Sequence, residues 1–209
     1  MKAATVAVLT LDDYGFAAEL GAVLAEAGVR IAEITLRTPN ALVALNRMTG
    51  IQGLELAAGT VRNPQQVGAA VDAGATWIIS PALDEDVIEA ARRRRVEPVP
   101  GVATATECHR AELLGLTNVK LFPANLLGGA EFVDAIAAPF PLLRFMPSGG
   151  INSDNAADYA ARPAVFAVAS SWMVAPHLVK TRKIDEIARR CRLVVVATAA
   201  AGNASAIRT

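Results

Sequence analysis

Short apolar segments alternate with segments of helical period along almost the whole chain, and this alternation constrains the fold more than any other sequence feature. Eight segments are short and rich in β-branched or apolar residues, as expected of strands buried on both faces. They span residues 5–10, 29–36, 54–59, 76–81, 96–101, 118–123, 142–147 and 164–170. Between them lie Ala-rich segments with helical spacing, several of which begin with Asp, Ser, Thr or Asn as caps.

Eight strand–helix units in 209 residues predict an α/β fold, a single (β/α)8 TIM barrel near the lower size limit of that architecture. A doubly wound open sheet is the alternative. It is less favoured because no GxGxxG or GxxxxGKS motif follows the first strand. Nothing marks a linker, so we predict one domain over residues 1–209, with residues 199–209 as a frayed C-terminal tail.

Charge and cysteine usage limit the class of partner. Lys plus Arg and Asp plus Glu number 20 each, which gives no reason to expect nucleic acid or an anionic membrane as partner. The longest apolar run, from Leu193, is about half the length needed to span a bilayer. Cys108 and Cys191 have no CxxC spacing and no secretory leader before them, which predicts a reduced, cytoplasmic setting. The balanced charge favours a small-molecule substrate. His109 and His177 stand outside any metal-ligand spacing, so we expect no metal.

Polar residues occupy one face of two predicted strands. Glu33, Thr35 and Arg37 alternate with apolar residues in the second strand, and Lys120 shares a face with Phe122 in the sixth. In a barrel these faces meet in the interior, near the strand ends where barrel enzymes place their chemistry. A purely structural ion pair of Glu33 with Arg37 or Lys120 is the alternative interpretation.

A buried lysine beside a second positive charge favours the uncharged amine, which attacks carbonyls. Lys120 is therefore a candidate for Schiff-base catalysis, in which the iminium of a 2-keto acid stabilises an enamine. Arg37 can bind the carboxylate of the keto acid through two parallel hydrogen bonds. Glu33 is the one acidic residue on these inward faces and becomes the candidate proton carrier.

Two loops carry the signs of an anion site. Gly149 and Gly150 follow the seventh strand, and Ser170 and Ser171 end the eighth. Adjacent glycines let backbone N–H groups approach an oxyanion, and loops at these places in barrels often bind phosphate. Together the two loops favour a phosphate site.

Seven motifs in register give a specific resemblance. EITLRT, AAGTVRNPQQ, ISPAL, PGVATATE, VKLFPAN, PSGGI and SSWMV resemble the 2-keto-3-deoxy-6-phosphogluconate (KDPG) aldolases, also described as 4-hydroxy-2-oxoglutarate aldolases, over nearly the whole chain. The resemblance implies that Lys120 forms the imine, Glu33 transfers protons and Arg37 binds the carboxylate. It further implies that the substrate is bound by Thr60, Pro81, Phe122, Ser148, Gly149, Gly150, Ser170 and Ser171.

The sequence departs from the family pattern at a few places. Ala58 and Ala82 each replace a glycine, and Ser148 replaces a threonine. Ala169 and Ser170 replace two glycines beside the expected phosphate. The phosphorylation state of the substrate and its configuration at C4 therefore stay open.

The resemblance implies a class I aldolase that cleaves a KDPG-like 2-keto-3-deoxy-6-phospho sugar acid to pyruvate and glyceraldehyde 3-phosphate. It implies a homotrimer that needs no cofactor or metal. An aldolase for an unphosphorylated 4-hydroxy-2-oxo acid, and an isomerase or epimerase of phosphorylated sugars, are the alternatives. A protein that binds such ligands without turnover is disfavoured by the intact set of Glu33, Arg37 and Lys120.

Overall fold

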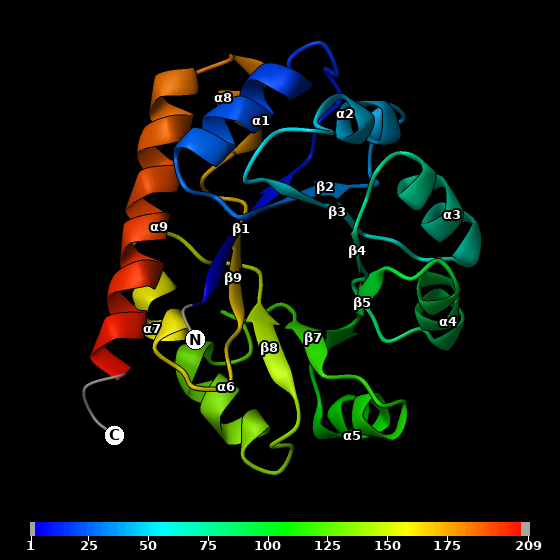
Figure 1. Cartoon of the computed structure of the whole chain (residues 1–209). Helices are drawn as coiled ribbons and strands as arrows, with labels where there is room; N and C mark the ends of the chain where they lie inside the picture. The colour runs from blue at the N-terminus through cyan, green and yellow to red at the C-terminus, as the bar shows by residue number, and fades with distance from the viewer. Residues whose placement is uncertain (1–2, 206–209) are drawn as a thin grey trace.

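Short parallel strands form the centre of the molecule, and helices lie around them (Figure 1). The computed structural model describes residues 3–205. Each predicted strand segment overlaps at least one observed strand. The strands are β1 (Ala4–Leu9), β2 (Ile31–Thr35), β3 (Glu55–Gly59), β4 (Trp77–Ile79), β5 (Glu97–Val99), β6 (Gly101–Val102), β7 (Asn118–Leu121), β8 (Arg144–Pro147) and β9 (Ala167–Ser170).

The helices follow the strands along the chain, and several begin where a capping side chain was expected. Asn63, Asp84 and Thr104 each accept a hydrogen bond from a backbone N–H three residues later, and Glu107 completes a capping box with Thr104. The helices are α1 (Ala17–Glu26), α2 (Ala41–Arg47), α3 (Pro64–Asp72), α4 (Glu85–Arg93), α5 (Ala105–Leu113), α6 (Gly129–Ala137), α7 (Ala156–Ala160), α8 (Pro176–Lys180) and α9 (Ile184–Ser205).

The strands form two parallel sheets. One sheet has six strands in the order β5-β4-β3-β2-β1-β9, and the other has three in the order β6-β7-β8. The prediction of a single closed eight-stranded (β/α)8 TIM barrel is therefore wrong, although the α/β class and the parallel pairing are correct. The last helix also extends beyond its predicted end, so residues 199–205 belong to α9, and residues 206–209 lie outside the described part of the chain.

Proline explains one break between the sheets. Pro100 has no N–H to donate, and it divides the predicted fifth strand into β5, which pairs with β4, and β6, which pairs with β7. At the other break, β8 meets the β9 segment only at two isolated bridges, Phe145–Val165 and Ser148–Ala169. The hydrogen-bonded ladder is thus interrupted twice, and the sheet stays open.

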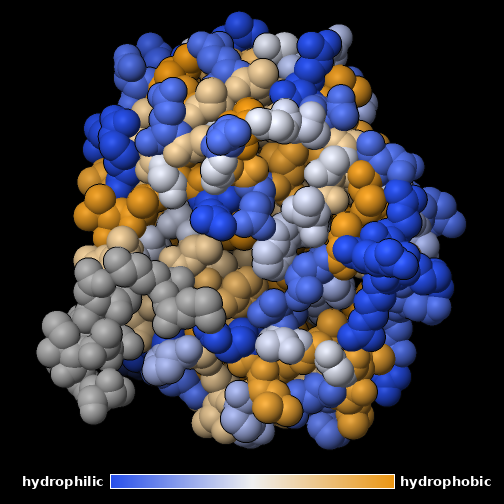
Figure 2. All heavy atoms as spheres, in the orientation of Figure 1, coloured by the Kyte–Doolittle hydropathy of each residue, from blue (hydrophilic) through white to orange (hydrophobic). Residues whose placement is uncertain are grey.

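Two apolar layers hold the sheets in place. Small and branched side chains from both sheets, including Val6, Ile79 and Met146, pack together between the strands. A larger cluster fills the space between the strands and the surrounding helices, where α9 lies beside α1 and α7 (Figure 1). The surface mixes hydrophilic and hydrophobic residues (Figure 2). Among the described residues, no helix combines the length and apolar character required to cross a membrane.

Candidate active site

A cavity of about 210 Å3 lies at the carboxyl ends of the strands, between the two sheets. The six-stranded sheet contributes residues from β1, β2 and the ends of β3, β4 and β9, and the three-stranded sheet contributes residues from β7 and β8. The lining consists of Val8, Glu33, Thr35, Arg37, Thr60, Pro81, Lys120, Phe122, Ser148, Gly149 and Ser171. The structure therefore brings together all of the predicted site residues except Gly150 and Ser170.

A buried ion pair joins the two candidate catalytic residues. Nζ of Lys120, on β7, lies 2.9 Å from Oε1 of Glu33, on β2. Both side chains are almost inaccessible, with 8% and 1% of their surface exposed. The other carboxylate oxygen of Glu33, Oε2, is buried without a hydrogen-bond partner among the described residues. The ion pair between Glu33 and Lys120 that the sequence suggested as an alternative is therefore present. It borders the cavity and does not lie in the closed core.

The pair can exchange a proton within itself. Burial penalises two separate charges, and the penalty is relieved either by a tight ion pair or by transfer of one proton from the ammonium to the carboxylate. Transfer leaves an uncharged Lys120 amine and a protonated Glu33, with no net change in charge.

Arg37 lies at the exposed side of the cavity without a carboxylate partner in the described residues. Its Nε donates to the hydroxyl of Thr35 at 3.2 Å, and its Nη2 donates to the hydroxyl of Thr10 at 2.6 Å. The Thr35 hydroxyl in turn donates to the carbonyl of Leu9. These contacts orient the guanidinium and leave its charge available for an anionic ligand.

The residue after β3 has an unusual backbone conformation. Thr60 has φ of +59°, a left-handed conformation that is uncommon for a β-branched residue. Such strain costs on the order of 1–3 kcal/mol and persists only where the surroundings impose it. Since Thr60 lines the cavity, the strained position coincides with the candidate site.

Phe122 and the loop after β8 form the other wall. The Phe122 ring centroid lies 5.7 Å from Nζ of Lys120, and its side chain is partly exposed. Gly149 has φ of +98°, and a β-carbon there would lie 3.2 Å from Cα of Pro123 and 3.3 Å from the Phe122 ring. A residue with a side chain would be strained at this position, so the close approach of the two loops requires glycine.

The two replaced glycines of the resemblance lie in strand β9. Neither Ala169 nor Ser170 has a positive φ, so their side chains carry no left-handed strain. The Ser170 hydroxyl is buried and donates to the carbonyl of Ile151 at 2.7 Å, which ties β9 to the loop after β8. Ser171 follows it and lines the cavity. Ser170 thus shapes the loop, and Ser171 faces the ligand space.

Some site residues were missed from the sequence. Thr35 was noticed on the inward face but not assigned to the site, and Val8 and Thr10 end the first strand, where barrel enzymes place functional groups. Gly59 was also missed. A glycine inside a strand is the signal for close backbone approach, and here the Glu33 side chain packs against it.

No group of three or more His, Cys, Asp or Glu side chains in residues 3–205 is arranged to hold a metal ion. The polar groups around the cavity are instead one amine, one carboxylate, one guanidinium and several hydroxyls. That set matches the needs of covalent carbonyl chemistry.

Comparisons with known proteins agree with this chemistry. Residues 1–190 match the family model described as KDPG and KHG aldolase. The 2-dehydro-3-deoxy-phosphogluconate aldolase of Treponema pallidum is 39% identical over 173 residues, which cover 81% of each chain.

Two solved structures are also similar. A KDPG aldolase from Legionella pneumophila, with pyruvate captured as a covalent carbinolamine intermediate, has a TM-score of 0.86 and 32% identity, covering 92% of this chain and 94% of that one. An aldolase from Zymomonas mobilis, described with 3-phosphoglycerate, has a TM-score of 0.84 and 31% identity, covering 92% and 91%. This chain belongs to the KDPG and KHG aldolase family.

Proposed function

We propose that this chain is a class I aldolase that cleaves a 2-keto-3-deoxy-6-phospho sugar acid to pyruvate and glyceraldehyde 3-phosphate. The buried contact of 2.9 Å between Lys120 and Glu33, at the edge of a cavity that also contains Arg37, carries the proposal. Family membership supports the reaction type, and the Legionella carbinolamine supports a covalent intermediate with pyruvate in that relative.

The first stage forms the imine. Proton transfer to Glu33 frees the amine of Lys120, which attacks C2 of the keto acid to give a carbinolamine. Glu33 returns the proton to the carbinolamine hydroxyl, which leaves as water and produces an iminium, so Glu33 is again a carboxylate. Arg37 holds the substrate carboxylate. Phe122 and Pro81 limit the space around the reacting carbon.

The second stage breaks the carbon–carbon bond. Glu33, as carboxylate, takes the proton of the C4 hydroxyl, directly or through water. The electron pair of the C3–C4 bond moves into the iminium, which releases the aldehyde and leaves an enamine on Lys120. Protonation at C3 and addition of water to the imine then release pyruvate and restore the amine.

The distal phosphate is assigned to the loops after β8 and β9. Ser148, Gly149 and Ser171 line that part of the cavity. A phosphate monoester there would accept hydrogen bonds from hydroxyl and backbone N–H groups. The relative from Zymomonas, described with 3-phosphoglycerate, supports a phosphate ester as ligand of this family.

The comparisons favour the phosphorylated substrate, and one observation leaves room for a second, unphosphorylated one. Apart from Arg37 and Lys120, no lining residue of the cavity is cationic. A phosphate would therefore be bound by hydrogen bonds alone. An unphosphorylated 4-hydroxy-2-oxo acid would lack those hydrogen bonds but keep its contacts with Arg37 and Lys120, so part of the binding free energy would remain. The family description covers both substrate types.

The proposal is tested by reductive trapping. Borohydride added with pyruvate should attach one reduced pyruvate unit to the peptide that contains Lys120, and peptide mass spectrometry locates it. Lys120→Arg keeps a positive charge beside Glu33 but cannot form the imine, and should remain unlabelled. A label on any other lysine would overturn the assignment.

A cytoplasmic homotrimer is the expected state. Phe122, at the edge of the cavity, and Leu126, four residues later, are exposed and offer apolar surface for contact between subunits. Light scattering during gel filtration measures the assembly, and a monomer at micromolar concentration would reject the trimer.

A further inference from the structure

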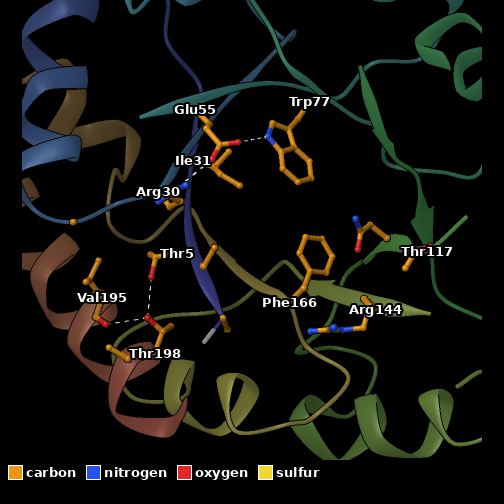
Figure 3. Close-up of a pocket in the computed structure, with 15 residues that line it drawn as sticks. Thr5, Arg30, Ile31, Glu55, Trp77, Thr117, Arg144, Phe166, Val195 and Thr198 are labelled. Carbon is orange, nitrogen blue, oxygen red and sulfur yellow. Dashed lines mark hydrogen bonds and ion pairs between the residues drawn. The ribbon is translucent and has the colours of Figure 1, made fainter. Parts of the chain in front are cut away.

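A second cavity of about 620 Å3 lies at the opposite ends of the strands from the candidate active site (Figure 3). It is lined by residues at the amino ends of β1, β2, β3, β4, β7, β8 and β9, and by residues of α9. Because all strands run in parallel, the amino ends gather on one face and the carboxyl ends on the other. The two cavities therefore share strands but no lining residue.

Most polar side chains of this cavity already have partners. Glu55 accepts from Nε of Arg30 at 3.1 Å and from the indole N–H of Trp77 at 2.9 Å (Figure 3). The hydroxyls of Thr5 and Thr198 bond to each other at 2.8 Å. These groups are satisfied within the protein and do not require a ligand.

Arg144 is the exception. It begins β8 and lines the cavity, and it forms no ion pair with any carboxylate in the described part of the chain. Its Nε is buried without a hydrogen-bond partner among those residues. A buried donor of a charged group is costly to leave unpaired. Since Arg30 is neutralised by Glu55, Arg144 leaves one uncompensated positive charge in the lining.

Apart from Thr117 and from Asn118, which donates to Glu97, the rest of the wall is mainly apolar. Phe166 lies close to Arg144 in Figure 3, and Ile31, Val195 and the indole of Trp77 face the same space. A ligand here would place an apolar body against these side chains and an anionic group on the guanidinium. The cavity is large enough for a ligand of metabolite size.

We propose that this cavity is a second binding site, for a small organic carboxylate with an aromatic or branched apolar body. Its carboxylate pairs with Arg144, and its apolar part packs against Phe166 and Trp77. The site is separate from the proposed aldolase site and does not depend on that function.

The probe is 3-phenylpropionate, with the neutral 3-phenylpropionamide as its matched counterpart. Calorimetry should show one molecule of the acid bound per chain, and the emission of Trp77 should change on binding. The amide should bind at least about tenfold more weakly, because it cannot form a charge-assisted pair with the guanidinium. Equal binding of acid and amide, or no binding of the acid, would overturn the proposal.

Two arginine variants locate the bound probe. Arg144→Met removes the charge of the second cavity and should weaken binding of the acid at least about tenfold, with aldol cleavage retained. Arg37→Met removes the corresponding charge of the active-site cavity and should leave binding of the acid unchanged. The reverse pattern would place the probe in the active site and reject the second site.

A third variant keeps the test decisive if Arg144→Met fails to fold. Val195→Phe fills the cavity from α9 without changing any charge, and it should abolish binding of the acid while circular dichroism and cleavage activity stay normal. Undiminished binding in folded Val195→Phe would exclude this cavity as the site.

Discussion

Gly59 leaves no room for a β-carbon beneath the side chain of Glu33: a β-carbon on Gly59 would lie 2.6 Å from Cγ of Glu33. The position of the acid therefore depends on the absence of a side chain on the neighbouring strand. Gly59 does not have a positive φ, so close approach is the reason for glycine here and backbone conformation is not.

Gly59→Ala should displace Glu33 from Lys120 and lower kcat for cleavage at least about tenfold, since a shift near 1 Å at a proton carrier has such an effect. Steady-state kinetics measures it. Gly68→Ala is the matched control because its β-carbon meets only Nη1 of Arg94, at 3.9 Å. In helix α3 that change should raise the free energy of unfolding by about 0.5–1 kcal/mol and leave kcat unaltered. Full activity of Gly59→Ala would contradict the close-packing argument.

Glu33→Gln should separate imine formation from cleavage. The amide keeps the size of the side chain but cannot take the C4 hydroxyl proton. Without the carboxylate, the ammonium of buried Lys120 loses its stabilising charge, and its proton passes to water in the cavity instead. Cleavage should slow by roughly 100-fold or more, while borohydride still traps pyruvate on Lys120. Single-turnover kinetics and peptide mass spectrometry measure the two steps. Near-normal turnover in the folded variant would show that Glu33 has only a structural role as the ion-pair partner of Lys120.

Thr10→Val should affect substrate binding more than chemistry. It removes the hydroxyl that accepts a hydrogen bond from Nη2 of Arg37 and leaves the guanidinium less well oriented. KM for the keto acid should rise about threefold to tenfold with kcat nearly constant, as expected for loss of about 1 kcal/mol of hydrogen bonding. Thr10→Ser retains the hydroxyl and should behave like the wild type. A change in kcat alone would argue against a positioning role.

Ser170, the last residue of β9, and the adjacent Ser171 should respond differently to substitution. Phosphorylated substrate should be preferred by at least about tenfold in kcat/KM, which requires about 1.4 kcal/mol of differential binding. Ser171→Ala should reduce that preference without changing the free energy of unfolding, because its side chain lines the cavity. Ser170→Ala should instead lower the free energy of unfolding by about 1 kcal/mol, because it loses the bond to Ile151.

Both substrates are compared by a coupled pyruvate assay, and stability by urea unfolding. If the wild type treats phosphorylated and unphosphorylated substrates alike, the phosphate assignment is incorrect and the unphosphorylated acid becomes the substrate. If Ser170→Ala and Ser171→Ala have identical effects, the structural distinction between the two hydroxyls fails.

The two cysteines should be unreactive in the folded protein. Burial, with smaller contributions from Glu107 and Glu112, raises the pKa of the Cys108 thiol to about 12, and burial likewise raises that of Cys191 to about 12. The thiolate is the reactive form, so at about pH 8 almost none is present and an aromatic disulfide reagent should release no colour. Denaturant should expose both thiols. Rapid reaction of one thiol without denaturant would show local opening around α5 or α9.

The strand segments and the polar faces of two strands were predicted from local pattern, whereas Thr60, Pro81 and Phe122 were assigned to the cavity from the family resemblance. Alternation placed Glu33 and Arg37 on one face of β2, and the motif around Lys120 placed the amine on β7. Capping residues such as Asn63 and Asp84 also fixed helix starts correctly, because their hydrogen bonds are local.

Long-range packing could not be predicted in the same way. Closure of the barrel required a continuous ladder around all strands, and the consequence of Pro100 depends on which strands pair on either side of it. The role of Ser170 depends on the carbonyl of Ile151, 19 residues away. The sequence suggested that Glu33 could pair with either Arg37 or Lys120, and the packing of the two sheets decides in favour of Lys120.

Pro100 interrupts the hydrogen-bonded ladder between the two sheets, and the proposed catalytic residues lie on either side of it in the sequence. Glu33 and Arg37 precede it, whereas Lys120 follows it, and β9 returns from the second half of the chain to pair with β1 of the first. Neither half alone contains both a nucleophile and its proton acceptor. On the proposed mechanism, imine formation with pyruvate requires both halves of the chain in their folded arrangement, so borohydride trapping of pyruvate would report on complete folding.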